Sequence, residues 1–418
     1  MRVVFILLDA FKQEYISEMN TPFLYSKSGE GKHIKKLIPS AGFCERTEIF
    51  FGLKPKQSGF FTAIGFNPNN GAYKASFFLN LFGWIEQKLS LLFYFLWKNK
   101  KNSFDTFFQK ILQKIYFKFF GSFEKMKPYK IPLNFLKYFN LTEDEFELNE
   151  LKEINGNKSL FEIVKELKKE TYLGAFTSLG SVSNGTDVDR INLAVEASKN
   201  EKNLFIPIYI NTADFNGHHF GPNSKKLKEK VKELDSILEN CMESFLANDP
   251  ATKFIFLGDH GMTEVKKVVD VKMELLDISK KFNLKLEKDY IFFLDSTLLR
   301  LWFFNDKTRN IFNEEFKKNS FFVNNGIVID HNLANKYDIP IDDRRYGDIA
   351  WWANEEVLIF PDFFHNDKAV KGMHGYEPNK KSTYGTCFFW DKNSRNEEIE
   401  ELELHQIYNF IKKALITV

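Results

Sequence analysis

The residues of this chain best suited to chemistry are six aspartates and histidines that stand near the ends of apolar runs or beside glycines. They are Asp9, Asp214, His218, Asp259, His260 and His374. Carboxylate oxygens and imidazole nitrogens are good zinc ligands, and both also accept manganese. A glycine adjoins each of the three histidines, which lets a loop fold tightly around an ion. The pattern predicts a metal site.

Each of these residues alone has an ordinary explanation, because a lone histidine more often makes core hydrogen bonds and a lone aspartate after a strand more often caps a helix. The three acids, however, each follow an apolar run: Asp9 after 3–8, Asp214 after 204–210 and Asp259 after 253–257. Ligands bind at the carboxyl ends of the strands in open α/β sheets, so these runs predict one shared site. We therefore expect an α/β fold with a doubly wound, mostly parallel sheet.

The predicted core is discontinuous along the chain, and two inserted cap segments interrupt it. The core comprises residues 1–70, 158–272 and 347–418, and the insertions are an aromatic, lysine-rich helical segment at 71–157 and a small α+β cap at 273–346. Within the core, residues 397–415 predict a closing helix.

Composition excludes some classes of function. The formal net charge of +2 over 418 residues does not indicate a nucleic-acid binder, and no specific nucleic acid is predicted as a partner. Three distant cysteines, Cys44, Cys241 and Cys387, do not form a disulfide pattern, which favours a reducing, cytoplasmic location. The apolar run 3–8 is too short for a signal peptide.

Three motifs carry a resemblance to a known family. They are Asp214-x-x-Gly217-His218-x-x-Gly221-Pro222, Asp259-His260-Gly261-Met262 and His374-Gly375-Tyr376, with Thr21-Pro22-Phe23 and Gly52-Leu53-Lys54-Pro55 as further matches. The set resembles the type I phosphodiesterase/nucleotide pyrophosphatase branch of the alkaline phosphatase superfamily. The resemblance covers the core and neither insertion.

The resemblance implies a metallo-phosphoesterase core with two divalent metal ions, zinc first and manganese as the alternative. One metal would be held by Asp214, His218 and His374, and the other by Asp9, Asp259 and His260. Two neighbouring metals suit an in-line displacement at phosphorus, because they stabilise both the attacking and the leaving oxygen.

The nucleophile is the point at which the chain departs from the family, which uses threonine or serine before the first helix. Counting back from Gly52 without gaps places Gly42 at that position, and glycine has no side chain to attack with. Cys44 is the preferred candidate, because a helix N-terminus, Arg46 and a metal would favour its thiolate. A small buried cysteine is the alternative interpretation. Thr47 and Ser40 are the fallback nucleophiles.

Arg46 is a candidate phosphate ligand through bidentate hydrogen bonds, and a surface salt bridge with Glu45 or Glu48 is the alternative. The stretch Cys44-Glu45-Arg46-Thr47-Glu48 lacks the Cys-x-Pro/Ala-x-Arg motif of sulfatases, which argues against sulfate esters.

The expected function is therefore metal-dependent hydrolysis of a phosphodiester or phosphomonoester, through a covalent intermediate if Cys44 is competent. The substrate could be nucleotide- or lipid-linked. A phosphotransferase or mutase of the same superfamily is one alternative. A catalytically silent, metal-binding protein of the membrane surface is another, motivated by Gly42 and by the aromatic insertion.

The insertion carries aromatic residues over 77–97 followed by clustered lysines up to residue 130. Polar residues interrupt the apolar run, so a transmembrane helix is not expected. Aromatics beside lysines are typical of an interfacial helix on an anionic leaflet, which would place the protein at the inner face of the membrane. A helical cap packed on the core explains the same pattern equally well. Single-stranded nucleic acid would need an aromatic platform that the segment lacks.

Overall fold

A computed structural model describes residues 2–96, 101–120, 126–142, 150–177 and 185–417. Its main sheet has seven strands in the order β19-β2-β18-β9-β1-β8-β7. Their bounds are β1 Val3–Leu8, β2 Lys32–Ile38, β7 Glu170–Thr171, β8 Asn203–Ile210, β9 Lys253–Gly258, β18 Gly385–Trp390 and β19 Glu397–Glu403. The strands β9, β1, β8 and β7 pair in parallel, and β18 is antiparallel to both of its neighbours.

The centre of this sheet is covered on both faces, as the apolar run 3–8 predicts. Val4, Ile6 and Leu8 pack into one core and Val3 and Phe5 into another, since successive side chains of a strand point to opposite faces. Helices α1 (Pro22–Glu30), α8 (Asp187–Ala197) and α10 (Lys225–Asn248) contribute to the first core, and α2 (Glu45–Phe51), α7 (Leu160–Glu166) and α15 (Ile407–Ile416) to the second. The doubly wound, mostly parallel α/β class is confirmed.

The predicted closing helix over 397–415 is wrong in its first half. Residues Glu397–Glu403 form the edge strand β19, parallel to β2, and only Ile407–Ile416 are helical. Ile399 and Leu402 of β19 pack against the core that contains Ile34 and Leu37 of β2. In addition, Lys32 lies 2.7 Å from Glu397 and Lys35 lies 2.7 Å from Glu398. The acids of β19 thus find cationic partners across the strand pair.

A second, antiparallel sheet lies beside the main sheet and has the order β12-β13-β15-β14. Its strands are β12 Tyr290–Leu294, β13 Leu298–Phe303, β14 Gly326–Val328 and β15 Ile349–Ala353, and helices α11 (Val271–Phe282), α12 (Asp306–Lys318), α13 (Ser320–Asn325) and α14 (His331–Tyr337) accompany it. Strand β15 pairs with β13, although it follows residue 346, where the sequence suggests the boundary of the cap.

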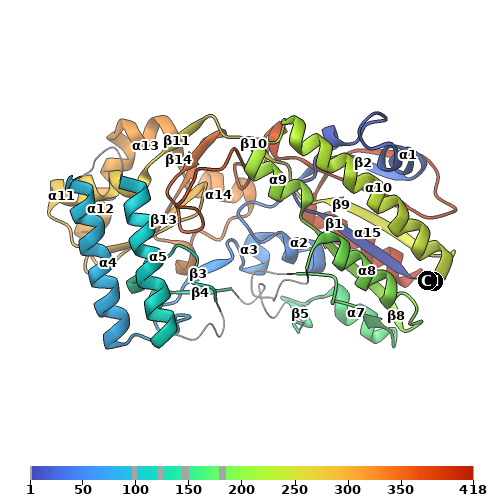
Figure 1. The fold of residues 1–418 in the computed structure, drawn as a ribbon, viewed down its shortest axis with the longest axis horizontal. Helices are drawn as coiled ribbons and strands as arrows, with labels where there is room; N and C mark the ends of the chain where they lie inside the picture. Colours follow the sequence, from blue (N-terminus) through green and yellow to red (C-terminus); the bar gives the residue numbers. More distant parts are fainter. Residues whose placement is uncertain (1, 97–100, 121–125, 143–149, 178–184, 418) are drawn as a thin grey trace.

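The aromatic insertion forms two long helices, α4 (Phe77–Leu96) and α5 (Lys101–Phe119), which lie side by side at one end of the molecule (Figure 1). Helix α4 packs on the 3-10 helix η2 (Leu133–Tyr138), and both helices contribute to the core of the second sheet. A Cβ atom at Gly83 would lie 2.5 Å from Cβ of Asn134, so glycine allows the close approach of α4 to η2. Among the described residues, no helix has the length and apolar character needed to cross a bilayer.

Shorter elements connect these units. They are α3 Pro55–Ser58, β3 Ile64–Phe66, β4 Phe139–Leu141, α9 Thr212–Phe220, β10 Thr263–Glu264, β11 Lys267–Val269, β16 Val357–Ile359 and β17 Gly372–Met373. Two of the pairings matter for the site: β10 is antiparallel to β17, and β11 is parallel to β16.

Candidate metal centre

The three acids of the predicted site come from neighbouring parallel strands. Asp9 follows β1, Asp259 follows β9, and Asp214 lies in the first turn of α9, directly after β8. Because these strands pair in the order β9-β1-β8, their carboxyl ends meet at one edge of the sheet. His374 reaches the same edge because it follows β17, whose partner β10 begins three residues after His260.

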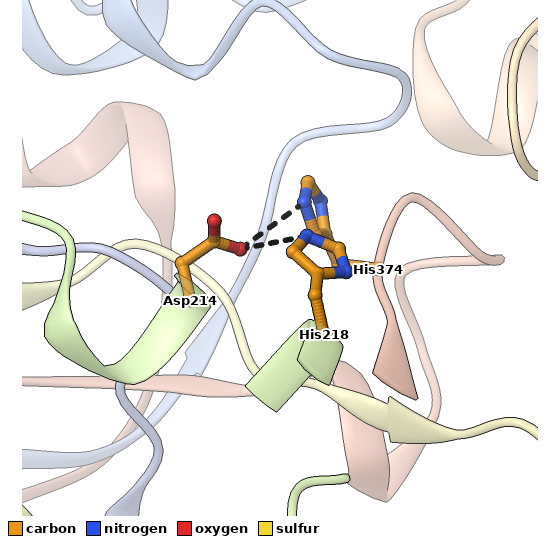
Figure 2. A group of neighbouring side chains, drawn as sticks. All are labelled: Asp214, His218 and His374. Carbon is orange, nitrogen blue, oxygen red and sulfur yellow. Dashed lines mark ion pairs between the residues drawn. The ribbon is translucent and has the colours of Figure 1, made fainter. Parts of the chain in front are cut away.

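One group consists of Asp214, His218 and His374 (Figure 2). The Oδ1 atom of Asp214 lies 3.0 Å from Nε2 of His218 and 3.5 Å from Nε2 of His374. Asp214 and His218 share one face of α9 because they are four residues apart. The intervening Gly217 packs on Met262, whose Cε would lie 3.0 Å from a Cβ atom there.

The other group consists of Asp9, Asp259 and His260. Nε2 of His260 lies 3.3 Å from Oδ1 of Asp9 and 3.8 Å from Oδ1 of Asp259. Asp259 also accepts hydrogen bonds from the backbone amides of Ala10 and His260, at 3.2 and 3.0 Å. The two groups adjoin, because the rings of His260 and His374 stack with centroids 4.2 Å apart.

Backbone carbonyls orient two of the imidazoles. Nδ1 of His218 lies 2.8 Å from the carbonyl oxygen of Gly372, and Nδ1 of His260 lies 2.9 Å from that of Gly261. A carbonyl oxygen only accepts, so each Nδ1 carries hydrogen and donates it. In the neutral imidazole, Nε2 then presents its lone pair to the carboxylates, as in metal-bound histidines.

The donor set fits divalent cations. Nε2 of His218 lies 3.0 Å from the buried Oδ1 of Asp214. Burial lowers the pKa of His218, but the charge of Asp214 outweighs it and raises that pKa above its usual value, so the pair favours a positive charge, which a proton on His218 or a bound cation would supply. Burial raises the pKa of Asp259 to about 8, and burial with the neighbouring His260 and His218 lowers the pKa of His374 well below its usual range. A metal ion stabilises the ionised carboxylate and binds the neutral imidazole, so it satisfies both groups at once.

Cys44, the candidate nucleophile, lies at the N-cap of α2 and is 2% exposed. The residues on either side of it reach both metal groups. The ring of Phe43 packs edge-on against His374 at 5.9 Å between centroids, and the charge of Glu45 contributes to raising the pKa of Asp259. Cys44 therefore lies between a residue that packs against His374 and a residue whose charge acts on Asp259.

The structure also places the fallback nucleophiles Thr47 and Ser40 and explains the glycine at position 42. Thr47 is buried within α2, and the hydroxyl of Ser40 donates to the carbonyl oxygen of Ala41 at 3.2 Å. Gly42 has φ +88°, and a Cβ atom there would lie 2.7 Å from a ring carbon of Phe61. Gly42 is thus required by the backbone turn, which explains glycine at this position without reference to catalysis.

Arg46 lies near the second group. Its guanidinium stacks at 5.6 Å over the ring of Phe176, and its charge acts on Tyr209, whose hydroxyl donates to Asp9. Burial, followed by the charge of Asp9, raises the pKa of Tyr209 well above its usual value, so Tyr209 stays a proton donor.

Four residues near the two groups are not predicted as site residues from the sequence: Phe43, Glu45, Tyr209 and His365. The ring of His365 lies 6.1 Å from that of His218 between centroids. Its Nδ1 lies 3.3 Å from the Ser296 hydroxyl and 3.4 Å from the buried carboxylate of Asp362. Tyr209 could have been found as a polar tip at the end of the run 204–210. The spacing of His365 carries no such signal, because a loop fold alone brings it to the site.

Fold and site together define an α/β protein with paired carboxylate and imidazole groups at the carboxyl ends of its strands. Residues 3–377 match the family model described as type I phosphodiesterase / nucleotide pyrophosphatase. The chain belongs to this family, a branch of the alkaline phosphatase superfamily, and family and fold together support phosphoester hydrolysis or transfer as its chemistry.

Solved structures of similar fold agree with the family. The chain is similar to murine ectonucleotide pyrophosphatase/phosphodiesterase 5, an inactive variant in complex with AMP, with a TM-score of 0.66 and 14% identity over 100% of this chain and 95% of that one. The human protein of the same name gives a TM-score of 0.67 at 14% identity with the same coverage.

A shorter match links the chain to a transferase. The chain is 31% identical over 81 residues to GPI ethanolamine phosphate transferase 1 of Mus musculus. This stretch covers 19% of the chain and only 9% of that protein, so it carries no conclusion on the activity of the whole.

Proposed function

We propose that this protein is a metal-dependent phosphoesterase that hydrolyses a phosphodiester or phosphomonoester at a two-metal site. The observation that carries the proposal is the adjacency of two three-residue groups in which imidazole Nε2 atoms lie within 4 Å of carboxylate oxygens. Such a site suits hard-to-borderline divalent cations, with zinc first and manganese as the alternative. Asp214, His218 and His374 would hold one ion, and Asp9, Asp259 and His260 the other.

When bound, the metal ions supply positive charge that stabilises the oxygens of the reacting phosphate. Cys44 is the proposed nucleophile. Its thiolate sulfur forms a bond to phosphorus as the bond from phosphorus to the leaving oxygen breaks, and the leaving oxygen takes a proton from solvent. A water molecule then attacks the phosphorus of the cysteinyl phosphate and releases a proton to solvent, and the sulfur leaves as thiolate. Arg46 would bind a phosphate oxygen during both steps.

Transfer to an acceptor other than water is the second candidate function. The partial similarity to an ethanolamine phosphate transferase favours it, because a transferase passes the phosphoryl-containing group to an alcohol. In that reaction the alcohol replaces water in the second step. Product analysis with an added alcohol separates the two: a new phosphodiester indicates transfer, and free monoester alone indicates hydrolysis.

The substrate class is also a proposal. A nucleotide-linked ester is supported by the fold shared with a phosphodiesterase that binds AMP, and a lipid-linked ester by the transferase match. A cytoplasmic location at the inner face of a membrane rests on the sequence, and cell fractionation tests it. Recovery of the native protein outside the cytoplasm would contradict it.

The test uses the purified full-length protein and bis(p-nitrophenyl) phosphate. We expect turnover that is lost on chelation and returns with zinc or manganese. His218→Gln should lower bound metal from about two ions towards one, as measured by elemental analysis, and should abolish turnover. His331→Gln is the matched control, because His331 is exposed at the start of α14 and belongs to neither group.

A silent metal-binding protein gives a different pattern. It would bind two ions and show no turnover with any ester, and His218→Gln would change metal content alone. Turnover that survives both chelation and His218→Gln would contradict the two-metal proposal.

A further inference from the structure

The outer face of the helical hairpin α4–α5 carries large apolar side chains that are exposed by about a third to three quarters of their surface. On α4 it comprises Phe77, Leu81, Trp84 and Leu92, and on α5 Ile115 and Phe119. Phe77 is 73%, Trp84 55% and Phe119 65% exposed. The spacing of four, three and eight residues on α4 places its members along one stripe of the helix.

This outer face is opposite the side of α4 that packs on the protein. Leu79 is fully buried there, and Gly83 touches Asn134 of η2. The two helices are held together by the stacked rings of Phe78 and Phe120, whose centroids are 4.1 Å apart. The hairpin therefore has its own packing, and the outer stripe is not part of it. Exposed apolar patches of this kind mark interaction surfaces.

Lysines accompany the stripe. Lys88, Lys114 and Lys118 are exposed, and the Lys88 and Lys118 ammonium groups lie 5.9 and 5.5 Å from the rings of Trp84 and Phe119. Glu86 points the other way: it is buried and accepts a hydrogen bond from the Leu133 amide at 2.8 Å. Among the described side chains of α4 and α5, no acid shares the face with these lysines.

We propose that this outer face docks on a membrane surface rich in anionic lipids. The aromatic side chains would enter the boundary between headgroups and acyl chains, and the lysines would contact lipid phosphates. The helices would lie in the plane of the interface, which agrees with the lack of a spanning helix among the described residues. The proposal concerns a surface distinct from the metal centre and holds whether or not the chain is catalytic.

The positive charge of the outer face favours an anionic membrane, rather than a second copy of the chain, as its partner. In a two-fold dimer the same patch faces itself, so the lysines of one copy would meet those of the other. The face offers no described acid to pair with them, whereas an anionic leaflet supplies a negative partner for every lysine.

The hairpin also contacts the loop that carries His365. Nδ2 of Asn366 donates to Oε1 of Gln109 at 2.6 Å, and the ammonium group of Lys110 lies 2.7 Å from Asp367. Helix α5 thus connects the outer face of the hairpin to the loop of His365, whose ring lies beside that of His218. This contact suits a substrate that is presented at the membrane surface.

Vesicle sedimentation of the full-length protein tests the proposal. We expect the protein to pellet with vesicles of phosphatidylcholine and phosphatidylglycerol in equal parts and to stay largely in solution with phosphatidylcholine alone. Each lysine near an anionic surface strengthens partitioning about fivefold, so Lys114→Gln with Lys118→Gln should weaken it about 25-fold. Trp84→Ser with Phe77→Ser should weaken binding while leaving turnover of a soluble ester unchanged.

Matched controls separate docking from general charge or folding effects. Lys226→Gln with Lys232→Gln removes the same charge from exposed positions on α10, and Val323→Ser removes an exposed apolar side chain elsewhere. These variants should bind as the wild type does. The proposal is overturned if the wild-type protein does not bind anionic vesicles, or if the control variants lose as much binding as the variants of the outer face. It is also overturned if Trp84→Ser instead converts a dimer to a monomer in sedimentation velocity.

Discussion

Substitutions at Gly42 and Cys44 distinguish the two interpretations of the nucleophile loop. If Gly42 occupies the position of a lost nucleophile, Gly42→Thr should create or raise turnover. If instead Gly42 serves the turn and Cys44 attacks, Gly42→Thr should disrupt the loop, whereas Cys44→Ser should retain a weakened hydroxyl nucleophile. The structure supports the second outcome, because Gly42 has φ +88° and faces Phe61.

The cost of Gly42→Thr follows from its contacts. Forcing a residue with a Cβ atom into the left-handed region costs about 1–2 kcal/mol. The new side chain would also collide with the carbonyl oxygen and the ring of Phe61, and would break the 2.9 Å hydrogen bond from the Phe43 amide to that carbonyl, at about 1 kcal/mol. We therefore expect a loss of about 2–3 kcal/mol in the free energy of unfolding.

The assay combines urea unfolding, followed by circular dichroism, with initial rates on bis(p-nitrophenyl) phosphate. Gly42→Thr should lower both stability and rate, because Phe43 and Cys44 move with the loop. Cys44→Ala should leave stability within about 1–2 kcal/mol of wild type and reduce the rate by several orders of magnitude. A stable, more active Gly42→Thr variant, or an unchanged rate in Cys44→Ala, would refute the reasoning.

Two further predictions concern residues near the site. Burial raises the pKa of Glu48 to about 8 from 4.5, so the folded chain holds a proton that the unfolded chain releases; stability should fall as pH rises from about 4.5 to 8. Urea midpoints at pH 5 and pH 8 measure this slope, and the same slope in Glu48→Gln would assign it to another group. His365→Asn should raise KM more than it lowers kcat and leave metal content unchanged, if His365 contacts substrate beside His218. Loss of a bound ion in that variant would instead make His365 a ligand.

The six metal-ligand candidates and the strands β1, β8 and β9 could be predicted from the sequence because their signals are local, whereas helix α9, which carries Asp214 and His218 where the sequence suggests a loop, could not. An apolar run that ends at an acid predicts a buried parallel strand, and the carboxyl ends of such strands lie at the same edge of an open α/β sheet. The same two groups of three then meet in space, Asp9 with Asp259 and His260, and Asp214 with His218 and His374. Their role as ligands stays a prediction until metal is measured.

Tertiary structure alone decided the features that depend on distant partners. Residues 397–403 have a composition that suits a helix, yet they form an edge strand, in which Ile399 and Leu402 pack on the core and the acids pair with lysines of β2. His365 lies beside His218 because Asp362 and Ser296, together with contacts from α5, hold its loop, and these contacts have no signature in residue spacing. At residue 42 the sequence has glycine where the family has its nucleophile. Only the position of Phe61 reveals that the backbone turn at Gly42 has no room for a side chain. The local residue pattern indicates which secondary structure a segment prefers. Contacts between segments decide which of these preferences the folded chain adopts.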